Sequence, residues 1–404
     1  MEAYDINQSP CLLVIGAREH TLQKLKAMNI QYMLIQSQLD PLTEYLDEQI
    51  VFVDTYENLS EISRMAEKLH LVHHFRAIVS FTEFGLYPAA LIAEQLNIKG
   101  NAVFPVEYTR DKFKMRRLLK KYQLSSIAYQ SCTTLEDVAV FYEQIKAPFI
   151  LKPVHGAGSQ GVCYVNSLES IPNAWSWAVT HGSQELIAEE YLLGKEYSVE
   201  SLSLDGQHQI IAITEKLTTE FPHFIELEHY SPARLTLEIQ QKIQQIILHF
   251  LDIIQHQNGP AHTEIKVHQG EIKIIESQTR MGGDQIWELT ELTTGVDVIS
   301  ETVCHLLGLS KKARNKKENA AAVLFFAREF EEILDINGLK SAQHLPGIVR
   351  IHCTLKKGQK LGKLSSSQSR QGYILGTGHN IDDAISTLRL AMEQVQITSK
   401  VHHD

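Results

Sequence analysis

The chain has 404 residues, of which 44% are apolar and 21% charged, a balance typical of a globular protein with about two to four compact lobes. Its net charge of −10 argues against a broad basic surface for nucleic acid, so a small anionic ligand would need a local cationic pocket.

The first ten residues, MEAYDINQSP, are polar and acidic, which argues against a secretory signal. The five cysteines are widely spaced and form no CxxC pair, a pattern typical of reduced thiols in a cytoplasm. The longest apolar run, at residues 320–327, is too short to span a bilayer. These features predict a soluble, cytoplasmic protein.

An open α/β sheet is predicted for residues 1–109. Apolar segments at 11–17, 30–36, 50–54 and 77–81 indicate strands, and helical patterns separate them. Strands and helices that alternate at this spacing predict a parallel sheet with helices on both faces. No GxGxxG follows the first strand, so dinucleotide binding is not predicted there.

A basic amphipathic helix is predicted at residues 110–124, and a glycine-rich loop follows it. The segment LKPVHGAGSQGVCYV has Lys152 near the end of an apolar strand. Its glycines Gly156, Gly158 and Gly161 spell GxGxxG. A dinucleotide site would need a helix after this loop, but VCYV indicates a strand.

Two other phosphate-binding motifs also fail here. A P-loop would end in GK[ST], and in protein kinases the lysine follows the glycine loop instead of preceding it. What remains is a strand–loop–strand hairpin. It could be a cover whose N–H groups close over phosphates, with Lys152 adding a point charge, or a plain glycine-rich hairpin with a partly exposed lysine. The loop alone does not separate these alternatives.

The segment ELIAEEYLLGKEYSVES contains a candidate nucleoside site. An apolar strand runs into Glu189, Glu190, Tyr191 and Leu192, and Glu196 follows Gly194. The backbone groups of a strand end beside an apolar wall would suit an adenine ring. A carboxylate a few residues later could bind ribose hydroxyls.

The segment AHTEIKVHQGEIKIIESQTR predicts two strands joined around Gly270. Pairing centred on that glycine sets Val267 opposite Lys273, Ile265 opposite Ile275 and Glu264 opposite Glu276. Facing like charges destabilise a sheet unless a cation lies between them, and carboxylate oxygens suit magnesium with nucleotide phosphates. The alternative is a surface hairpin whose glutamates point into water. Together with the upstream lysine and glycine loop, the pair favours a metal site.

Arg280, four residues beyond Glu276, could bring several N–H donors to a phosphoryl group in transfer. A charge run at 311–319 indicates a solvated linker. Strand patterns and turn glycines then predict a small β-rich lobe at residues 310–404, with a final helix at 381–395.

From about residue 111 to residue 284, these motifs resemble the ATP-grasp superfamily in order and spacing, and the flanking regions resemble its outer domains. Within it, the chain looks most like the bacterial L-amino-acid ligases, which make dipeptides. The resemblance implies an α/β fold with an α+β ATP-grasp core. The implied domains are an N-terminal α/β domain at 1–109, a linker helix and ATP lid at 110–193, a catalytic subdomain at 194–309 and the β-rich lobe at 310–404.

The resemblance also implies a role for each matching residue. Lys112 and Lys152 would contact the nucleotide phosphates, and Glu196 would bind the ribose. Glu264 and Glu276 would ligate magnesium, and Arg280 would steady the γ-phosphate and an acyl phosphate. The other implied ATP-binding residues are His155, Gly156, Gly158, Ser159, Gln160 and Gly161 in the loop, and Glu189, Glu190, Tyr191 and Leu192 around the adenine.

Gln278 departs from the superfamily pattern, in which Asn often follows the second metal glutamate by two residues. A longer amide can still present a carbonyl oxygen to the metal. The resemblance further implies that Glu83 meets substrate ammonium groups, and that Glu226 and His229 contact substrate and phosphate. Asp284 would shape the pocket of the first amino acid and favour a basic side chain, or would simply cap the next helix.

The implied activity is an ATP-dependent carboxylate–amine ligation that proceeds through an acyl phosphate and gives ADP and phosphate. ATP and two magnesium ions, replaceable by manganese, would be required, amino acids would be the substrates, and a homodimer would be compatible. No nucleic acid or membrane partner is expected. The alternatives are an ATP-grasp ligase or carboxylase acting on a carboxylate other than an amino acid, and a non-catalytic ATP-binding protein.

Overall fold

A computed structural model describes residues 11–39, 42, 49–219, 221–310, 314–315 and 318–401. The first ten residues, on which the prediction of no secretory signal rests, lie outside the described residues, as does part of the predicted linker at 311–319. Among the residues that are described, no helix is both long and apolar enough to cross a membrane.

The N-terminal region forms the predicted parallel sheet. Its elements are β1 (Cys11–Ile15), α1 (Glu19–Ala27), β2 (Gln31–Ser37), β3 (Ile50–Val53), α2 (Leu59–His73), β4 (Ala77–Val79) and α3 (Leu86–Leu96). The strands lie in the order β3-β2-β1-β4, and each neighbouring pair is parallel. Leu12 packs with the core that includes α1, whereas Leu13 packs with the core that includes α2 and α3. Both faces of the sheet are therefore covered, as parallel sheets require.

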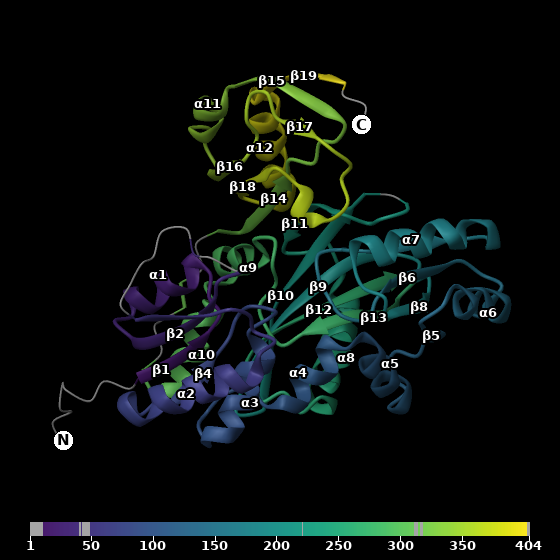
Figure 1. Cartoon of the computed structure of the whole chain (residues 1–404). Helices are drawn as coiled ribbons and strands as arrows, with labels where there is room; N and C mark the ends of the chain where they lie inside the picture. Colours follow the sequence, from purple (N-terminus) through teal and green to yellow (C-terminus); the bar gives the residue numbers. More distant parts are fainter. Residues whose placement is uncertain are drawn as a thin grey trace.

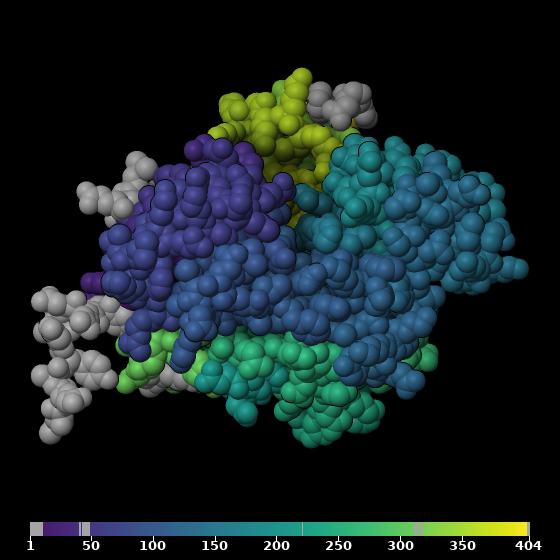
Figure 2. Space-filling model, turned by 60° about the horizontal axis from the view of Figure 1, so that its bottom comes forward, coloured from purple at the N-terminus to yellow at the C-terminus, as the bar shows by residue number. Residues whose placement is uncertain are grey.

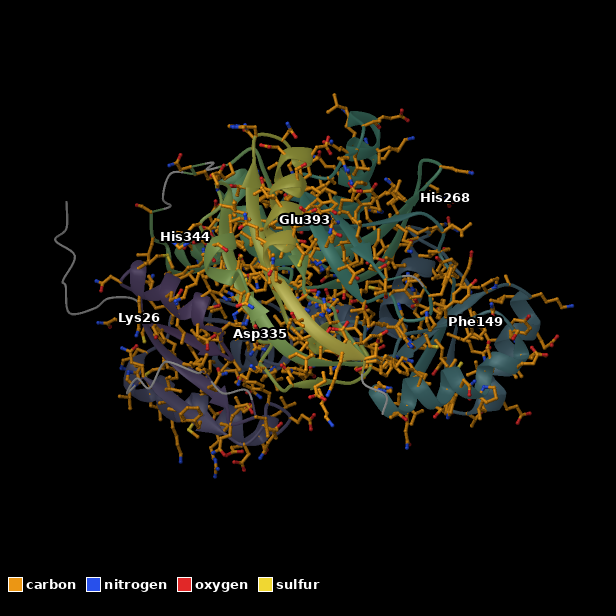
Figure 3. The ribbon with its side chains drawn as sticks, turned by 90° about the horizontal axis from the view of Figure 1, so that it is seen from above. Lys26, Phe149, His268, Asp335, His344 and Glu393 are labelled. Atoms are coloured by element: carbon orange, nitrogen blue, oxygen red, sulfur yellow. The ribbon has the colours of Figure 1, made fainter. Side chains whose placement is uncertain are left out.

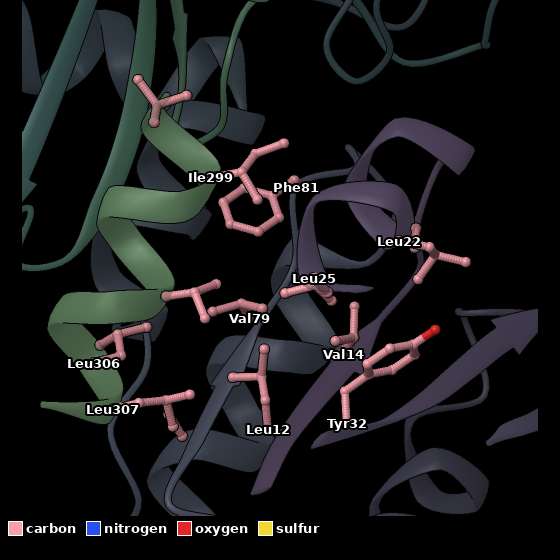
Figure 4. Close-up of a cluster of buried hydrophobic side chains, with 14 of the residues drawn as sticks. Leu12, Val14, Leu22, Leu25, Tyr32, Val79, Phe81, Ile299, Leu306 and Leu307 are labelled. Carbon is pink, nitrogen blue, oxygen red and sulfur yellow. The ribbon is translucent and has the colours of Figure 1, made fainter. Parts of the chain in front are cut away.

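Helix α10 (Val298–Leu307) is distant in sequence from this sheet but belongs to its core. Its residues Ile299 and Leu306 lie in the same buried cluster as Leu12 of β1 (Figure 4). The predicted catalytic subdomain at 194–309 therefore shares its last helix with the N-terminal domain.

The prediction of one basic helix at residues 110–124 is wrong in its extent. Two helices, α4 (Val103–Arg110) and α5 (Lys112–Lys121), meet at Asp111. The Asp111 backbone is extended, with φ −96° and ψ 103°, and its carboxylate accepts a hydrogen bond from the Lys114 N–H at 2.9 Å. Because Asp is a strong N-cap, the chain breaks here and Lys112 starts a new helix.

The lid region is a four-stranded antiparallel sheet in the order β5-β8-β6-β7. Strands β6 and β7 flank the glycine-rich loop, so the predicted strand–loop–strand arrangement is confirmed. The lid elements are β5 (Tyr129–Cys132), α6 (Leu135–Ile145), β6 (Phe149–Pro153), β7 (Cys163–Val165), a 3₁₀ turn at Leu168–Ser170, α7 (Ile171–His181) and β8 (Leu186–Glu190).

An eight-stranded sheet forms the centre of the molecule. Its strands are β9 (Lys195–Leu204), β10 (Gln207–Thr218), β11 (Glu226–Ser231), β12 (Gly259–His268), β13 (Glu271–Gln278), β14 (Ala320–Phe325), β16 (Ile348–Cys353) and β18 (Gly372–Gly378). The order is β13-β12-β9-β10-β11-β14-β18-β16. Helix α8 (Leu237–Ile253) packs residues such as Ile247 and Phe250 into one buried cluster with Ile265 and Ile274 of β12 and β13.

The C-terminal region is β-rich, as predicted, but it continues the central sheet, because β14 pairs with β11 on one side and β18 on the other. A second sheet has the order β17-β15-β19. The predicted final helix is confirmed as α12. The remaining elements are α9 (Ile286–Thr294), β15 (Glu331–Asn337), α11 (Leu339–Gln343), β17 (Lys360–Leu361), a 3₁₀ turn at Ser367–Ser369, α12 (Ile381–Gln394) and β19 (Gln396–Val401).

The N-terminal domain and the lid lie on opposite sides of the central sheet, and the C-terminal region rises above it (Figure 1). Seen from above, the C-terminal part with Asp335 and Glu393 lies between the N-terminal part with Lys26 and the lid with Phe149 (Figure 3). The molecular surface is hollowed where these three parts meet (Figure 2).

His256 provides a test of the core between α8 and β12. Its ring is fully buried, Nε2 lies 3.0 Å from the Gly259 carbonyl oxygen, and burial lowers its pKa from 6.5 to about 4. The neutral ring therefore stabilises the fold above pH 6.5, and this contribution is lost as the pH falls toward 4, on the order of 3 kcal/mol in all.

We expect the His256→Gln variant to lack this part of the pH dependence in denaturant unfolding. The exposed His268→Gln variant is the matched control, and a His256→Gln profile parallel to the wild-type profile would contradict the assignment.

Candidate functional site

A cleft with about 900 Å³ of empty space, part of it open to solvent, lies between the lid and the central sheet. The glycine-rich loop covers one side, and β12 and β13 contribute the opposite side. All the predicted ATP-binding residues except Gly161 line it, as do Glu226, Glu264 and Glu276. Gly161 lies at the base of the loop, where an added Cβ would be 3.0 Å from the Ala178 carbonyl oxygen.

The loop conformation depends on glycine. Gly156, Gly158 and Gly161 have φ values of 118°, 69° and 68°, a region that other residues adopt only at a cost. Lys112 reaches the loop from α5, and its Nζ donates to the Gly156 carbonyl oxygen at 3.0 Å. The same Nζ lies 3.3 Å from Glu276 Oε2. Lys112 thus joins the loop to the floor of the cleft.

Glu189 forms a buried ion cluster that the sequence did not reveal. Arg116 binds both of its carboxylate oxygens, at 2.7 and 3.0 Å, and Lys152 Nζ lies 2.7 Å from Oε2. Burial would raise the pKa of Glu189, but the two cations outweigh it and lower the pKa to about 2. The Glu189 carboxylate is therefore bound to these two cations, so a contact from this side chain to an adenine ring is not favoured. Arg116 lies one helical turn from Lys112, a spacing that could have identified it.

Two aromatic rings and a lysine lie together in the wall of the cleft. Tyr191 and Phe224 have ring centroids 6.0 Å apart, and Lys266 Nζ lies 5.4 Å from the Tyr191 centroid and 5.8 Å from that of Phe224. Burial lowers the pKa of Lys266. Tyr191 was predicted, whereas Phe224 and Lys266 were missed because nothing in the sequence places their segments beside Tyr191.

The hairpin of β12 and β13 differs from the predicted register near its turn. The observed pairs are Val267 with Ile272 and Ile265 with Ile274, in place of Lys273 and Ile275. The reason is a two-residue turn at Gln269 and Gly270, whose φ values of 49° and 82° are both positive. Pairing is therefore centred between these two residues and not on Gly270.

Glu264 nevertheless lies opposite Glu276, as predicted, because a bulge between Glu264 and Ile265 shifts the register by one residue. Gln278 donates from Nε2 to Glu276 Oε1 at 2.8 Å, so its amide lies next to the pair.

Two further cations hold Glu264. Lys216 hydrogen-bonds to its Oε1, and His262 Nε2 lies 3.3 Å from the same atom. Lys216 is buried and also lies 2.9 Å from Glu196 and 3.7 Å from Glu226, so these carboxylates raise its pKa against the effect of burial. Burial likewise disfavours protonated His262, but Glu200 and Glu264 raise its pKa to about 9. Neither residue was predicted, since their strands give no local signal of a shared charge cluster.

The carboxylates of Glu264 and Glu276 fit a magnesium ion. Two carboxylates on adjacent strands line one cleft, and hard oxygen ligands of this kind are what magnesium takes together with nucleotide phosphates. Across the described ranges, no three His, Cys, Asp or Glu side chains are arranged to hold an ion by themselves.

Arg280 and Glu83 come together from distant parts of the chain. Arg280 Nε donates to Glu83 Oε2 at 2.9 Å, and Arg110 Nε donates to Glu83 Oε1 at 3.3 Å. Burial acts to raise the pKa of Glu83, but the two arginines lower it overall. The predicted substrate-binding acid thus lies beside the predicted phosphate-binding arginine, 197 residues apart in sequence.

Asp284 does not cap a helix, because α9 has Gln285 at its N-cap position and no side-chain cap bond. Its carboxylate instead accepts a hydrogen bond from Arg370 Nη2 at 2.5 Å and lies 3.7 Å from His229 Nε2. His229 is fully buried, which lowers its pKa, and neither ring nitrogen has a hydrogen-bond partner among the described residues. Glu226, whose pKa is raised by burial, accepts from Ser367 Oγ.

Two domain families match the sequence. Residues 145–288 match the ATP-grasp domain, and residues 328–400 match the L-amino acid ligase C-terminal domain 2. The chain is similar to an alanine–anticapsin ligase of Bacillus subtilis strain 168, with 33% identity over 232 residues, 51% of this chain and 48% of that protein. It spans about half the length of the curated relatives it matches first.

Solved structures share the fold over nearly the whole chain. An L-amino acid ligase from Bacillus licheniformis is 20% identical, with a TM-score of 0.82 over 98% of this chain and 99% of that one. The biotin carboxylase domain of a Hydrogenobacter thermophilus 2-oxoglutarate carboxylase, a dimer in complex with MgADP, ADP and bicarbonate, is 17% identical, with a TM-score of 0.70 over 96% of this chain and 90% of that one. These matches agree with the cleft: the chain carries an ATP-grasp domain at residues 145–288 and an L-amino acid ligase C-terminal domain 2 at residues 328–400.

Proposed function

We propose that the protein is an ATP-dependent ligase that joins two amino acids into a dipeptide and releases ADP and phosphate. The observation that carries the proposal is the pair Glu264 and Glu276, which face each other across β12 and β13 in the cleft under the glycine-rich loop. The contact between Arg280 and Glu83 adds a carboxylate suited to a substrate ammonium group beside a guanidinium suited to a phosphoryl group.

Bringing a substrate carboxylate to the γ-phosphate sets one anion against another. Lys112 of α5 and Lys152 of β6 both line the cleft, and Arg280 lies beyond the end of β13, so positive charge from the chain offsets the repulsion. Glu264 and Glu276, with Gln278 next to them, would hold magnesium, which when bound neutralises phosphate charge and orients the transferring group.

The reaction would proceed in two steps. The carboxylate oxygen of the first amino acid attacks the γ-phosphorus and ADP leaves, which gives an acyl phosphate. The amine of the second amino acid then attacks the acyl carbon, phosphate leaves and the amine loses a proton. The chain supplies no nucleophile, and the glycine-rich loop would keep water from the acyl phosphate.

Phosphate release from ATP, measured with magnesium and each of the twenty amino acids, tests the proposal. We expect release to require an amino acid, and mass spectrometry of a mixed reaction to show a product equal to two amino acids minus water. Release that no amino acid stimulates would favour a ligase or carboxylase for another carboxylate. ATP binding without any release would favour a nucleotide-binding protein.

The preference for a basic first amino acid stays a prediction, and one contact argues against it. Arg370 already lies on Asp284 and compensates its charge. The same set of twenty assays measures this preference directly.

A further inference from the structure

The tip of the glycine-rich loop is held by the C-terminal region. The Ser367 N–H donates to the Gly158 carbonyl oxygen at 3.1 Å. A Cβ at Gly158 would lie 3.8 Å from Ser367 Cβ, so the two backbones are packed in contact. The segment at 363–370, here called the latch segment, is more than 200 residues from the loop in sequence and touches it directly.

A second set of hydrogen bonds joins the glycine-rich loop to the latch segment. Ser159, next to Gly158, donates from Oγ to the Phe224 carbonyl oxygen at 3.1 Å and lies 3.4 Å from Glu226 Oε1. The other Glu226 oxygen accepts from Ser367 Oγ. Glu226 thus lies between the loop and the latch segment, and both bind it.

The latch segment also contacts the body of the lid. Lys363 Nζ lies 4.5 Å from the ring centroid of Trp177 in α7, within the range of a cation–π interaction. Trp177 in turn stacks on His223, with ring centroids 3.7 Å apart, beside the strand that carries Glu226. Contacts at the loop tip and at α7 restrain the lid at two separate points.

Arg370 holds the latch segment in place. Its guanidinium donates to the Ser367 carbonyl oxygen at 2.7 Å, the Glu226 carbonyl oxygen at 3.0 Å and Asp284 Oδ1 at 2.5 Å. It also lies over the Phe325 ring, 3.7 Å from the centroid, and the side chain is only 6% exposed. A buried arginine bonded on three sides has little freedom, so it sets the position of Ser367 relative to β11 and the loop after β13.

We propose that Arg370 is a positioning residue, which through Ser367 holds the glycine-rich loop closed over the phosphates during the reaction. The inference rests on the proposed function, because it assigns a consequence to loop closure in that reaction. The hydrogen bonds of Arg370 go to Ser367, Glu226 and Asp284, so it acts on the loop through the latch segment.

The chemical consequence is the fate of the acyl phosphate. When the loop is closed, the amine attacks the acyl carbon and one amide forms for each phosphate released. When the loop is loosened, a water oxygen attacks instead, phosphate leaves, a proton is lost and the original carboxylate is regenerated. The ratio of phosphate to dipeptide therefore reports how well the loop is held, whatever fraction of the protein is active.

The sharpest test compares two changes at Ser367. Ser367→Ala removes the hydroxyl bond to Glu226, whereas Ser367→Pro removes that bond and also the N–H that binds Gly158. Proline is compatible with this position, because Ser367 begins a 3₁₀ turn and the preceding Ser366 is extended, with φ −164° and ψ 172°. We expect the phosphate-to-dipeptide ratio of Ser367→Pro to exceed that of Ser367→Ala by about two- to tenfold, the range given by one lost hydrogen bond.

Arg370→Met should raise the ratio as well, and Arg370→Lys should restore it only in part, since an ammonium cannot reproduce the planar fork. Arg328→Met is the matched control, because the Arg328 side chain binds Glu331 and Ser399 in the same region and makes no bond to the loop. Lower rates with an unchanged ratio in Ser367→Pro and Arg370→Met would overturn the inference. A wild-type protein that forms no dipeptide would instead overturn the proposed function, which keeps the two failures apart.

Discussion

Glu276→Gln is expected to lower amino-acid-dependent ATP turnover by about 10²- to 10³-fold, the loss typical of removing one preorganised group that stabilises the transition state. Glutamine keeps the size of the side chain and one acceptor oxygen but cannot offer a charged ligand to magnesium. Glu276 is a cleaner choice than Glu264, because Glu276 lies near one cation, Lys112, whereas Glu264 holds both Lys216 and His262.

Initial rates of phosphate release over a magnesium titration measure the effect, and the magnesium requirement should rise together with the loss of rate. Glu271→Gln is the matched control. It makes the same change on the same strand, but Glu271 is exposed at the turn and pairs with Lys273. A Glu276→Gln protein with the wild-type rate and magnesium dependence would contradict the assignment of Glu276 as a magnesium ligand in the proposed reaction.

Arg116→Met should lower the free energy of unfolding by about 3–5 kcal/mol, because breaking a buried ion pair is costly and Lys152 alone then remains to bind Glu189. The Arg116 guanidinium binds both Glu189 oxygens and the carbonyl oxygens of Ile274 and Ile275 at 2.6 and 2.7 Å. It thereby ties α5 to β8 and β13, and methionine satisfies none of these acceptors.

Denaturant unfolding of the wild-type and variant proteins measures this difference. Arg117→Met is the control, since Arg117 is the next residue on the same helix but is exposed, and a change there should stay within about 0.5 kcal/mol. Adding Glu189→Gln to Arg116→Met should recover part of the loss, because the buried carboxylate that Arg116 no longer binds is then neutral. Equal destabilisation by Arg116→Met and Arg117→Met would show that the buried cluster contributes little.

Local sequence patterns were sufficient to predict the elements whose apolar residues repeat with the period of a strand or of a helix. The four N-terminal strands and the final helix formed as predicted, because their apolar residues mark buried faces directly. The strand–loop–strand arrangement of the glycine-rich segment could also be predicted from the sequence, because VCYV after the loop indicates a strand and not a helix. The break at Asp111 was missed, although a capping residue stands there.

The register of the β12–β13 hairpin could be predicted only in part from the local sequence. A symmetrical turn on Gly270 gave the right partner for Glu264 but the wrong partners for Val267 and Ile265. The turn uses Gln269 as well, and a bulge then compensates the shift. Neither feature follows from alternation of residues alone, because turn type and bulge position depend on the neighbouring strand.

By itself, the sequence determined the strands of the N-terminal sheet, the glycine-rich loop with its lysine, and the pair of glutamates that face each other on one hairpin. Only the tertiary structure decided which charges meet: Arg116 with Glu189, Lys216 with Glu264, Arg280 with Glu83, and Arg370 with Asp284. The physical reason is that periodicity reports how each segment buries its own apolar face. Ion pairs between segments 48 to 197 residues apart depend on how those segments pack against one another.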